Sequence, residues 1–299
     1  AIPADATVEC GTVPAPAVIT ATDNCDGAVG VIFNETIAPT ACDQEYTITR
    51  TWETVDCSGN VNFAMQTITV EDTTAPAFVE ALPADLTVEC DAVQAAEVLT
   101  STDNCDDASS VSMTEEVTNQ TCAGAYTLTR TWTATDCAGN ATDHIQTITV
   151  IDTTAPVIDV AAADATAECD GAGNGGDLDG WLASNGGAAA SDACSDVTWS
   201  NDFDALSDDC GATGMATVTF TATDDCGNSS STTATFTIED TTAPAIDMAA
   251  MDATVECDGA GNGGDLTAWL ANNGGAMASD ACSDVTWSND FDALSDDCG

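Results

Sequence analysis

The stretch YTITRTWETVDCSGNVNFAMQTITV, residues 46–70, alternates large side chains with threonines on both sides of a short polar turn. Such alternation places every second side chain on one face of an extended segment, which predicts two half-buried β-strands. Gly59 and Asn60 lie between the two runs and predict the hairpin turn that joins them. The first predicted strand carries one shared face, formed by Tyr46, Ile48, Arg50 and Trp52.

This hairpin belongs to a repeat. It returns at residues 126–150 and again near residue 218, where Val218 replaces the arginine of the first two copies. We expect those arginines, Arg50 and Arg130, to lie near the rim of the core or to bury their stems there. An upstream phrase also recurs, ending at Cys10, Cys90, Cys169 and Cys257. The steps between these cysteines are 80, 79 and 88 residues, which indicates a tandem array of small modules.

The phrase DTTAP marks the predicted junctions, at residues 72–76, 152–156 and 240–244. A short junction that contains proline leaves little slack between neighbouring modules. We therefore predict an all-β protein with modules at 1–72, 73–152, 153–240 and 241–299, the last of them incomplete. Since the fourth copy stops inside the repeat, we expect the parent chain to be longer.

The third and fourth modules carry an insertion of about ten residues that contains a helix signal. Asp177 is the predicted N-cap, Leu178, Trp181 and Leu182 have helical spacing, and Gly186 ends the pattern. Asp265, Leu266, Trp269 and Leu270 repeat it. We interpret the helix as a lid whose Trp covers one end of the module; the alternative is a Trp that docks a glycan or a neighbouring chain.

Fifteen cysteines, four in each complete module, indicate disulfides formed in an oxidising compartment. A module of this size buries little apolar surface and is expected to need such bonds. No C-x₂-C spacing favours zinc. The third and fourth cysteines of a module flank a strand of ten residues, about 33 Å long, whereas bridged Cα atoms lie about 4.4–6.8 Å apart. These two therefore cannot pair.

If the segments of a module run up and down in order, its first cysteine meets the third and its second meets the fourth. The predicted bonds are Cys10–Cys42, Cys25–Cys57, Cys90–Cys122, Cys105–Cys137, Cys169–Cys210, Cys194–Cys226 and Cys257–Cys298.

The charge is lopsided, with 51 acidic residues against two basic ones and a formal net charge of −49. Phosphate binding needs Lys and Arg, so nucleic acid is excluded as a partner. Salt bridges cannot neutralise so many carboxylates, and solvent or bound cations must relieve their repulsion.

Repeated acidic loops suit calcium, which takes about 6–8 oxygen ligands. The up-and-down order brings the TDNC loop and the TDC-containing turn to the same end of a module. The candidate calcium ligands there are Asp23, Asn24, Asp26, Asp56 and Asn60 in the first module, Asp103, Asn104, Asp106, Asp136 and Asn140 in the second, and Asp192, Asp196, Asp224, Asp225 and Asn228 in the third. A second candidate set lies at the junctions and comprises Glu71, Asp72, Asp152, Glu239 and Asp240. The alternative is that these are solvated turn residues, because Asp, Asn and Gly favour turns.

The sequence does not predict an enzyme. Its one histidine, His144, lies at a strand position in a single module, and no phosphate loop, nucleophile elbow or zinc-protease motif is present. No apolar run approaches the roughly 20 residues of a membrane span, so membrane insertion of this segment is not expected.

The turn TATDCAGN at 133–140, the TDNC loop and the DTTAP junction resemble the hyalin (HYR) repeat, an immunoglobulin-like β-sandwich of extracellular adhesion proteins. The version with the GAGNGGDL insertion at 171–178 resembles modules of giant surface proteins of marine gliding Bacteroidota. The resemblance implies tandem immunoglobulin-like β-sandwich repeats in a secreted cell-surface adhesin or filament, exported by the type IX route.

We therefore expect a structural stalk or filament segment, stiffened by calcium and associated with copies of itself. The alternative function is an adhesive module that binds glycans or another cell's surface, with Trp181 and Trp269 as the contacts.

Overall fold

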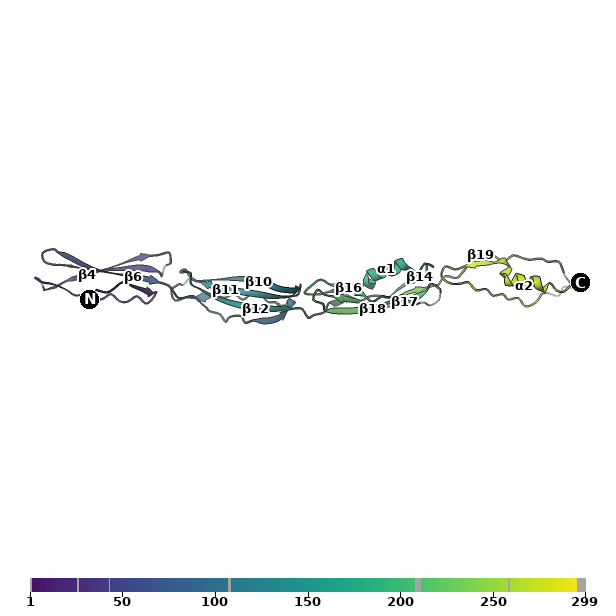
Figure 1. The fold of residues 1–299 in the computed structure, drawn as a ribbon, viewed down its shortest axis with the longest axis horizontal. Helices are drawn as coiled ribbons and strands as arrows, with labels where there is room; N and C mark the ends of the chain where they lie inside the picture. Colours follow the sequence, from purple (N-terminus) through teal and green to yellow (C-terminus); the bar gives the residue numbers. More distant parts are fainter. Residues whose placement is uncertain are drawn as a thin grey trace. The chain divides into compact units, whose positions relative to one another are not determined.

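The computed structural model describes residues 2–25, 27–42, 44–106, 109–207, 211–257 and 259–294. The chain divides into two compact units, Ala1–Ile151 and Asp152–Gly299. Each unit holds two of the repeated modules, and strands dominate both (Figure 1).

The first module is built on a four-stranded sheet of β1 (Ala6–Glu9), β4 (Val31–Pro39), β5 (Tyr46–Val55) and β6 (Val61–Glu71). Their order is β1-β6-β5-β4, with β1 parallel to β6 and the other pairs antiparallel. A separate hairpin joins β2 (Ala21–Asp23) to β3 (Gly27–Val29). The predicted hairpin of β5 and β6 is confirmed, and Gly59 takes the positive φ of +82° that its turn requires.

The second module repeats this sheet. Its strands β8 (Leu86–Glu89), β10 (Ser110–Cys122), β11 (Ala125–Thr135) and β12 (Ala141–Ile151) lie in the order β10-β11-β12-β8, again with one parallel pair. Two short strands, β7 (Ala77–Phe78) and β9 (Ser101–Thr102), pair outside it, and a 3₁₀ turn, η1 (Cys90–Ala92), follows β8.

The second unit contains the third and fourth modules. The four-stranded sheet of the third has the order β14 (Ala165–Glu168), β18 (Ser229–Glu239), β17 (Gly214–Thr223) and β16 (Thr198–Asn201). Beside it β13 (Val157–Val160) pairs with β15 (Ala189–Ser191), and α1 (Gly175–Ala183) leads into η2 (Asn185–Gly187). The fourth module has β19 (Ala245–Met248), α2 (Gly263–Ala271), η3 (Asn273–Gly275) and β20 (Met277–Ser279). The predicted class, all-β repeats with a short helical insertion, is confirmed.

The helix of the third module is a lid on the core. Trp181 is 9% exposed and packs its ring on Phe220 and Phe236, with ring centroids 5.1 and 5.5 Å away. Its indole Nε1 donates a hydrogen bond of 3.0 Å to the carbonyl oxygen of Ala163. Asp177 lies in the first turn and does not cap the helix, because the N-cap is Asn174 in the left-handed region. An exposed docking role for Trp181 is therefore wrong.

The first two modules cover the same face of the sheet with an irregular segment. Arg50, only 3% exposed, donates from Nη2 to the carbonyl oxygen of Pro14 at 2.8 Å and from Nε to Glu35 at 2.7 Å. Trp52 donates from Nε1 to the carbonyl oxygen of Ala17 at 3.2 Å. The two side chains thus hold residues 14–17 against the sheet by satisfying backbone acceptors that no strand partner serves.

The second module has the same arrangement. Arg130 is 5% exposed and donates to the carbonyl oxygen of Gln94 at 2.6 Å and to Glu115 at 2.8 Å. Both arginines are therefore buried, which agrees with the second of the two expected positions and not with the rim. Val218 takes this place in the third module, where it packs in one apolar cluster with Leu178 and Trp181 of the helix, so an arginine there would be buried among apolar side chains.

Replacing Arg130 with Ala should lower the free energy of unfolding by roughly 2–3 kcal/mol, because the Gln94 carbonyl loses its buried donor. Glu115→Gln is the matched control and should cost less than about 1 kcal/mol, since Glu115 has a side chain 44% exposed to solvent. Urea denaturation measures both. Equal losses for the two variants would show that the ion pair, and not the buried contact, is what matters.

Candidate functional site: the junction between modules

Three disulfides between described residues join successive modules. Cys10 bonds Cys105, Cys42 bonds Cys137 and Cys169 bonds Cys282, with Cα–Cα distances of 5.8, 5.7 and 6.0 Å. The first cysteine of a module thus pairs with the second of the next, and the third pairs with the fourth of the next. Each bond crosses a DTTAP junction.

These bonds correct the sequence prediction. The predicted pairings Cys10–Cys42, Cys105–Cys137 and Cys169–Cys210 are wrong, because at least one cysteine of each is bonded elsewhere. Cys25–Cys57 is wrong as well, since Cys25 forms no disulfide with any described residue. Cys257 is likewise an exposed thiol, and the partner predicted for it, Cys298, lies outside the described residues, as does Cys210.

The order of strands explains the error. Cys10 follows β1 and Cys42 precedes β5, so both lie at the same end of the first module, as predicted. However, β6 lies between β1 and β5. Neighbouring strands are about 4.8 Å apart, so the two cysteines are separated by about 10 Å across the sheet, which exceeds the Cα separation of about 4.4–6.8 Å that a disulfide spans.

Cys90, Cys122, Cys194 and Cys226 are also disulfide-bonded. The pairings Cys90–Cys122 and Cys194–Cys226, expected from the sequence, therefore stay predictions.

The disulfide completes the core of the preceding module. Cys105 is 4% exposed and packs with Cys10, Ile48, Ile68 and Val70 of the first module. Cys282 enters the core of the third module in the same way, beside Cys169. The second cysteine of one module is therefore a core residue of its neighbour.

Backbones also meet closely at the junction between the third and fourth modules. Ala212 N–H donates to the carbonyl oxygen of Cys282 at 3.0 Å. Gly211, next to it, has a φ of +64°, and a Cβ at this position would overlap the same carbonyl oxygen. Only glycine fits such an approach.

The junction peptide is clamped by a glutamate. The carboxylate of Glu9, the residue before the first cysteine, accepts hydrogen bonds from Thr73 N–H at 3.2 Å, Thr73 Oγ1 at 2.7 Å and Thr74 Oγ1 at 2.8 Å. These hydrogen bonds lower the pKa of Glu9 to about 2. Glu168 accepts the equivalent bonds from Thr241 and Thr242, which also lower its pKa. The two threonines of DTTAP therefore fasten the linker to the module that it leaves.

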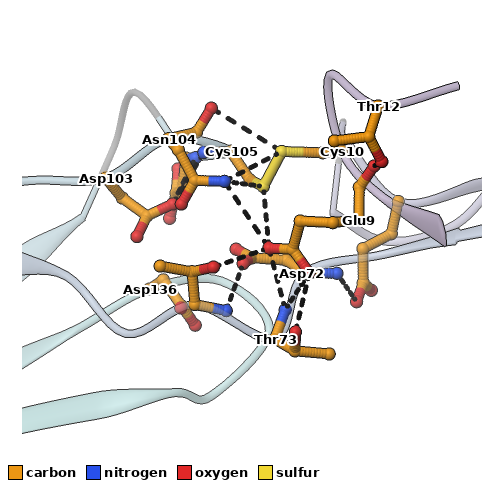
Figure 2. Close-up of a disulfide and its surroundings, with 12 residues drawn as sticks. Glu9, Cys10, Thr12, Asp72, Thr73, Asp103, Asn104, Cys105 and Asp136 are labelled. Carbon is orange, nitrogen blue, oxygen red and sulfur yellow. Dashed lines mark hydrogen bonds between the residues drawn. A yellow bond between two sulfur atoms is a disulfide. The ribbon is translucent and has the colours of Figure 1, made fainter.

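Carboxylates gather around this junction. Figure 2 shows Glu9, Asp72, Asp103 and Asp136 beside the Cys10–Cys105 disulfide. Asp72 and Asp136 are 8% and 7% exposed, and one carboxylate oxygen of Asp72 lies within 4.8 Å of one of Asp103. Burial raises the pKa of Asp72; a hydrogen bond from Thr74 N–H opposes the shift, and the charges of Asp103, Asp136 and Glu9 add to it.

The two acidic loops of the second module meet at this end. Asp106 Oδ2 accepts a hydrogen bond of 2.8 Å from Cys137 N–H, which joins the TDNC loop to the hairpin turn. Asn140 Nδ2 donates to the carbonyl oxygen of Asp72 at 3.1 Å and to Asp136 Oδ2 at 2.9 Å. The sequence placed the loop acids and the junction acids in separate sets; the structure brings them into one cluster.

The second unit repeats the cluster. Carboxylate oxygens of Asp152 and Asp192 lie within 4.8 Å of each other, and Asn228 Nδ2 donates to the carbonyl oxygen of Asp152 at 3.1 Å and to Asp224 Oδ2 at 2.8 Å. Ser283 Oγ donates to Asp240 Oδ2 at 3.4 Å.

Two candidate ligands of the first module, Asp56 and Asp23, accept hydrogen bonds within their own loops. Asp56 is engaged by its own turn, accepting hydrogen bonds from Ser58 N–H and from both nitrogens of Asn60, which lower its pKa. Asp23 accepts a bond from Cys25 N–H. Asn24 and Asp196 are exposed, and Asp26 lies outside the described residues.

The sulfurs of Cys10 and Cys105 and the ring of His144 are each engaged in a contact of their own. Cys10 and Cys105 are bonded to each other, so their sulfurs are not thiolate ligands for the nearby carboxylate cluster. His144 Nε2 lies 2.8 Å from the carbonyl oxygen of Pro83, a contact between its strand and the preceding loop. No helix in the described part of the chain has the length and apolar character needed to cross a bilayer.

Residues 1–70 and 78–150 match the family described as an HYR-like domain with four cysteines. The first two modules are thus similar to HYR-like domains. HYR-like modules are extracellular, adhesion-type repeats and are in general not enzymes. No curated protein sequence matches the chain.

Among solved structures, three cadherin ectodomains illustrate the similarities. Drosophila N-cadherin EC1-4 has 11% identity and a TM-score of 0.25 over 79% of this chain and 73% of its own. The protocadherin GammaB4 extracellular domain has 13% identity and a TM-score of 0.28 over 86% and 51%. Mouse clustered PcdhgC3 EC1-3 has 9% identity and a TM-score of 0.23 over 69% and 79%. Scores this low support no inference about function.

The Glu9 clamp predicts an acid-sensitive junction. The folded-state pKa of about 2 lies below the ordinary 4.5, so ionised Glu9 stabilises the fold above pH 4.5 and this contribution is lost as the pH falls from 4.5 towards 2. Glu9→Gln should therefore be less stable than the wild type at neutral pH, and the difference should vanish near pH 2. Urea denaturation across this range measures it.

Glu256→Gln is the control, because Glu256 holds the same place in the fourth module and its carboxylate accepts no hydrogen bond from the described residues. A Glu9→Gln protein as stable as the wild type at neutral pH would refute the clamp.

Proposed function

We propose that this chain is a stalk segment of an extracellular surface filament or adhesin, with junctions that are stapled by disulfides and stiffened by calcium. The observation that carries the proposal is the junction itself, where two disulfides, a glutamate clamp and a carboxylate cluster meet. The resemblance to surface proteins of gliding Bacteroidota suggests a cell surface of that kind.

The disulfide connectivity supports a role under tension. A pulling force that enters at residue 10 can pass through the Cys10–Cys105 bond and bypass residues 11–104. The Cys42–Cys137 bond supplies a second covalent path across the same junction. A module in such an array can therefore unfold without its chain extending to full length.

Calcium is the cation that the junction chemistry favours. Asp72, Asp103 and Asp136 offer carboxylate oxygens, and Asp103 Oδ2 is buried without a hydrogen-bond partner among the described residues. The backbone carbonyl of Asp72, which accepts a hydrogen bond from Asn140 Nδ2, adds a further oxygen. Such hard oxygen donors are those that calcium takes in proteins.

Neither arginine of the chain is available to form a salt bridge with these acids. Its two arginines are both buried in module cores, where they are paired with Glu35 and Glu115. Burial is the main cause of the raised pKa of Asp72, and a bound divalent ion would offset the added repulsion from Asp103, Asp136 and Glu9.

A thermal melt with calcium and with a chelator tests this proposal, together with native mass spectrometry for bound ions. Calcium should raise the stability by about 2.7 kcal/mol when its free concentration is about 100 times Kd. Asp72→Asn should be more stable than the wild type in chelator, because the raised pKa means that the folded state disfavours the ionised form. It should also show a smaller calcium effect.

Asp179→Asn is the matched control for charge, since Asp179 is exposed on α1 and belongs to none of the carboxylate groups described above. It should leave the calcium effect unchanged. Identical melting curves with calcium and with chelator, and a native mass without bound ions, would contradict calcium stiffening.

A further inference from the structure

Cys25 occupies, in the first module, the place that Cys105 and Cys282 occupy in the second and fourth. In all three the cysteine N–H donates to the aspartate two residues earlier, at 2.7, 2.7 and 2.9 Å, so the loops have the same local geometry. Cys105 and Cys282 each bond the first cysteine of another module. Cys25 is an exposed thiol in no disulfide with any described residue.

The surroundings of Cys25 also match those of the equivalent cysteine in the second module, Cys105. A hollow at this end of the first module is lined by Asp23, Asp56 and Asn60, among others. The equivalents of the last two residues in the second module are Asp136 and Asn140, and there Asn140 holds the backbone of the junction residue Asp72. The end that receives a neighbour in the second module is thus present, and open, in the first.

We propose that this end of the first module is a docking face for another module of the same repeat, and that Cys25 is sealed to that module's first cysteine by a disulfide. The first and second modules show the complex expected, with Cys10 in the role of that first cysteine. Formation of the bond removes one proton and one electron from each thiol. A disulfide oxidant such as oxidised glutathione accepts both electrons and is reduced to two thiols.

The chain also carries the complementary group. Cys257 ends the same phrase as Cys10 and Cys169, and it too is an exposed thiol in the described part of the chain. A second copy of the chain therefore offers the cysteine that Cys25 requires. This inference rests on the proposed function and names the partner of one end of the segment. Formation of the disulfide does not require calcium, so a chain that binds no calcium would still form it.

The decisive experiment places residues 1–80 a second time in front of Ala1, which reproduces the 80-residue step between Cys10 and Cys90. After refolding in a glutathione buffer, Cys25 should resist alkylation, and peptide mapping should find it joined to the added copy of Cys10. A Cys25 that stays open to alkylation, or that is joined to Cys57, overturns the proposal.

A matched control adds residues 1–72 only. It keeps the added cysteines, but it lacks the linker and no longer reproduces the 80-residue step. Here Cys25 should stay open to alkylation; protection equal to that in the longer chain would mean that an exposed thiol had reacted without docking, and would also overturn the proposal.

The unextended chain supplies a second readout. When isotopically labelled and unlabelled copies are oxidised together, Cys25–Cys257 should dominate the bonds between copies, and Cys257→Ser should abolish it. Statistical yields of Cys25–Cys25, Cys25–Cys257 and Cys257–Cys257 would show random coupling and contradict recognition between the two ends.

Discussion

The structure depends on a core that a module does not complete by itself. The apolar interior of the first module is small, with Ile48, Ile68 and Val70 at its centre, and Cys105 of the next module packs into it. Domains of this size bury a smaller fraction of the surface that their unfolded chains expose than larger domains do. Sharing a disulfide across the junction both adds buried contact and restricts the unfolded chain. Folding of one module and docking of the next are therefore coupled.

Electrostatics opposes this coupling. The junction brings Asp72, Asp103 and Asp136 together although the chain has only two basic residues, both used inside the modules. Hydrogen bonds favour the ionised form of Glu9, whereas burial and like charges disfavour that of Asp72. The disulfides hold these groups close, so the free energy of the junction becomes sensitive to cations and to pH.

Local pattern predicted the strands and the helix because their side chains repeat at short range. The alternation in residues 46–70 predicted β5 and β6, and the spacing of Leu178, Trp181 and Leu182 predicted α1. The disulfides were missed because pairing depends on the order of strands across the sheet, and that order places β6 between the cysteines expected to meet. The same long-range order decides that junction and loop acids form one cluster, and that an arginine at a strand position is buried beneath an irregular segment.

The most direct test of the shared core is the disulfide map of the natively oxidised chain. Cleavage after glutamate without reduction separates Cys10 from Cys42 and Cys105 from Cys137, so mass spectrometry of the linked peptides distinguishes the alternatives. Peptides joining Cys10 to Cys105 and Cys42 to Cys137 are predicted. Peptides joining Cys10 to Cys42, or Cys105 to Cys137, would contradict the account, because each module would then close its core alone.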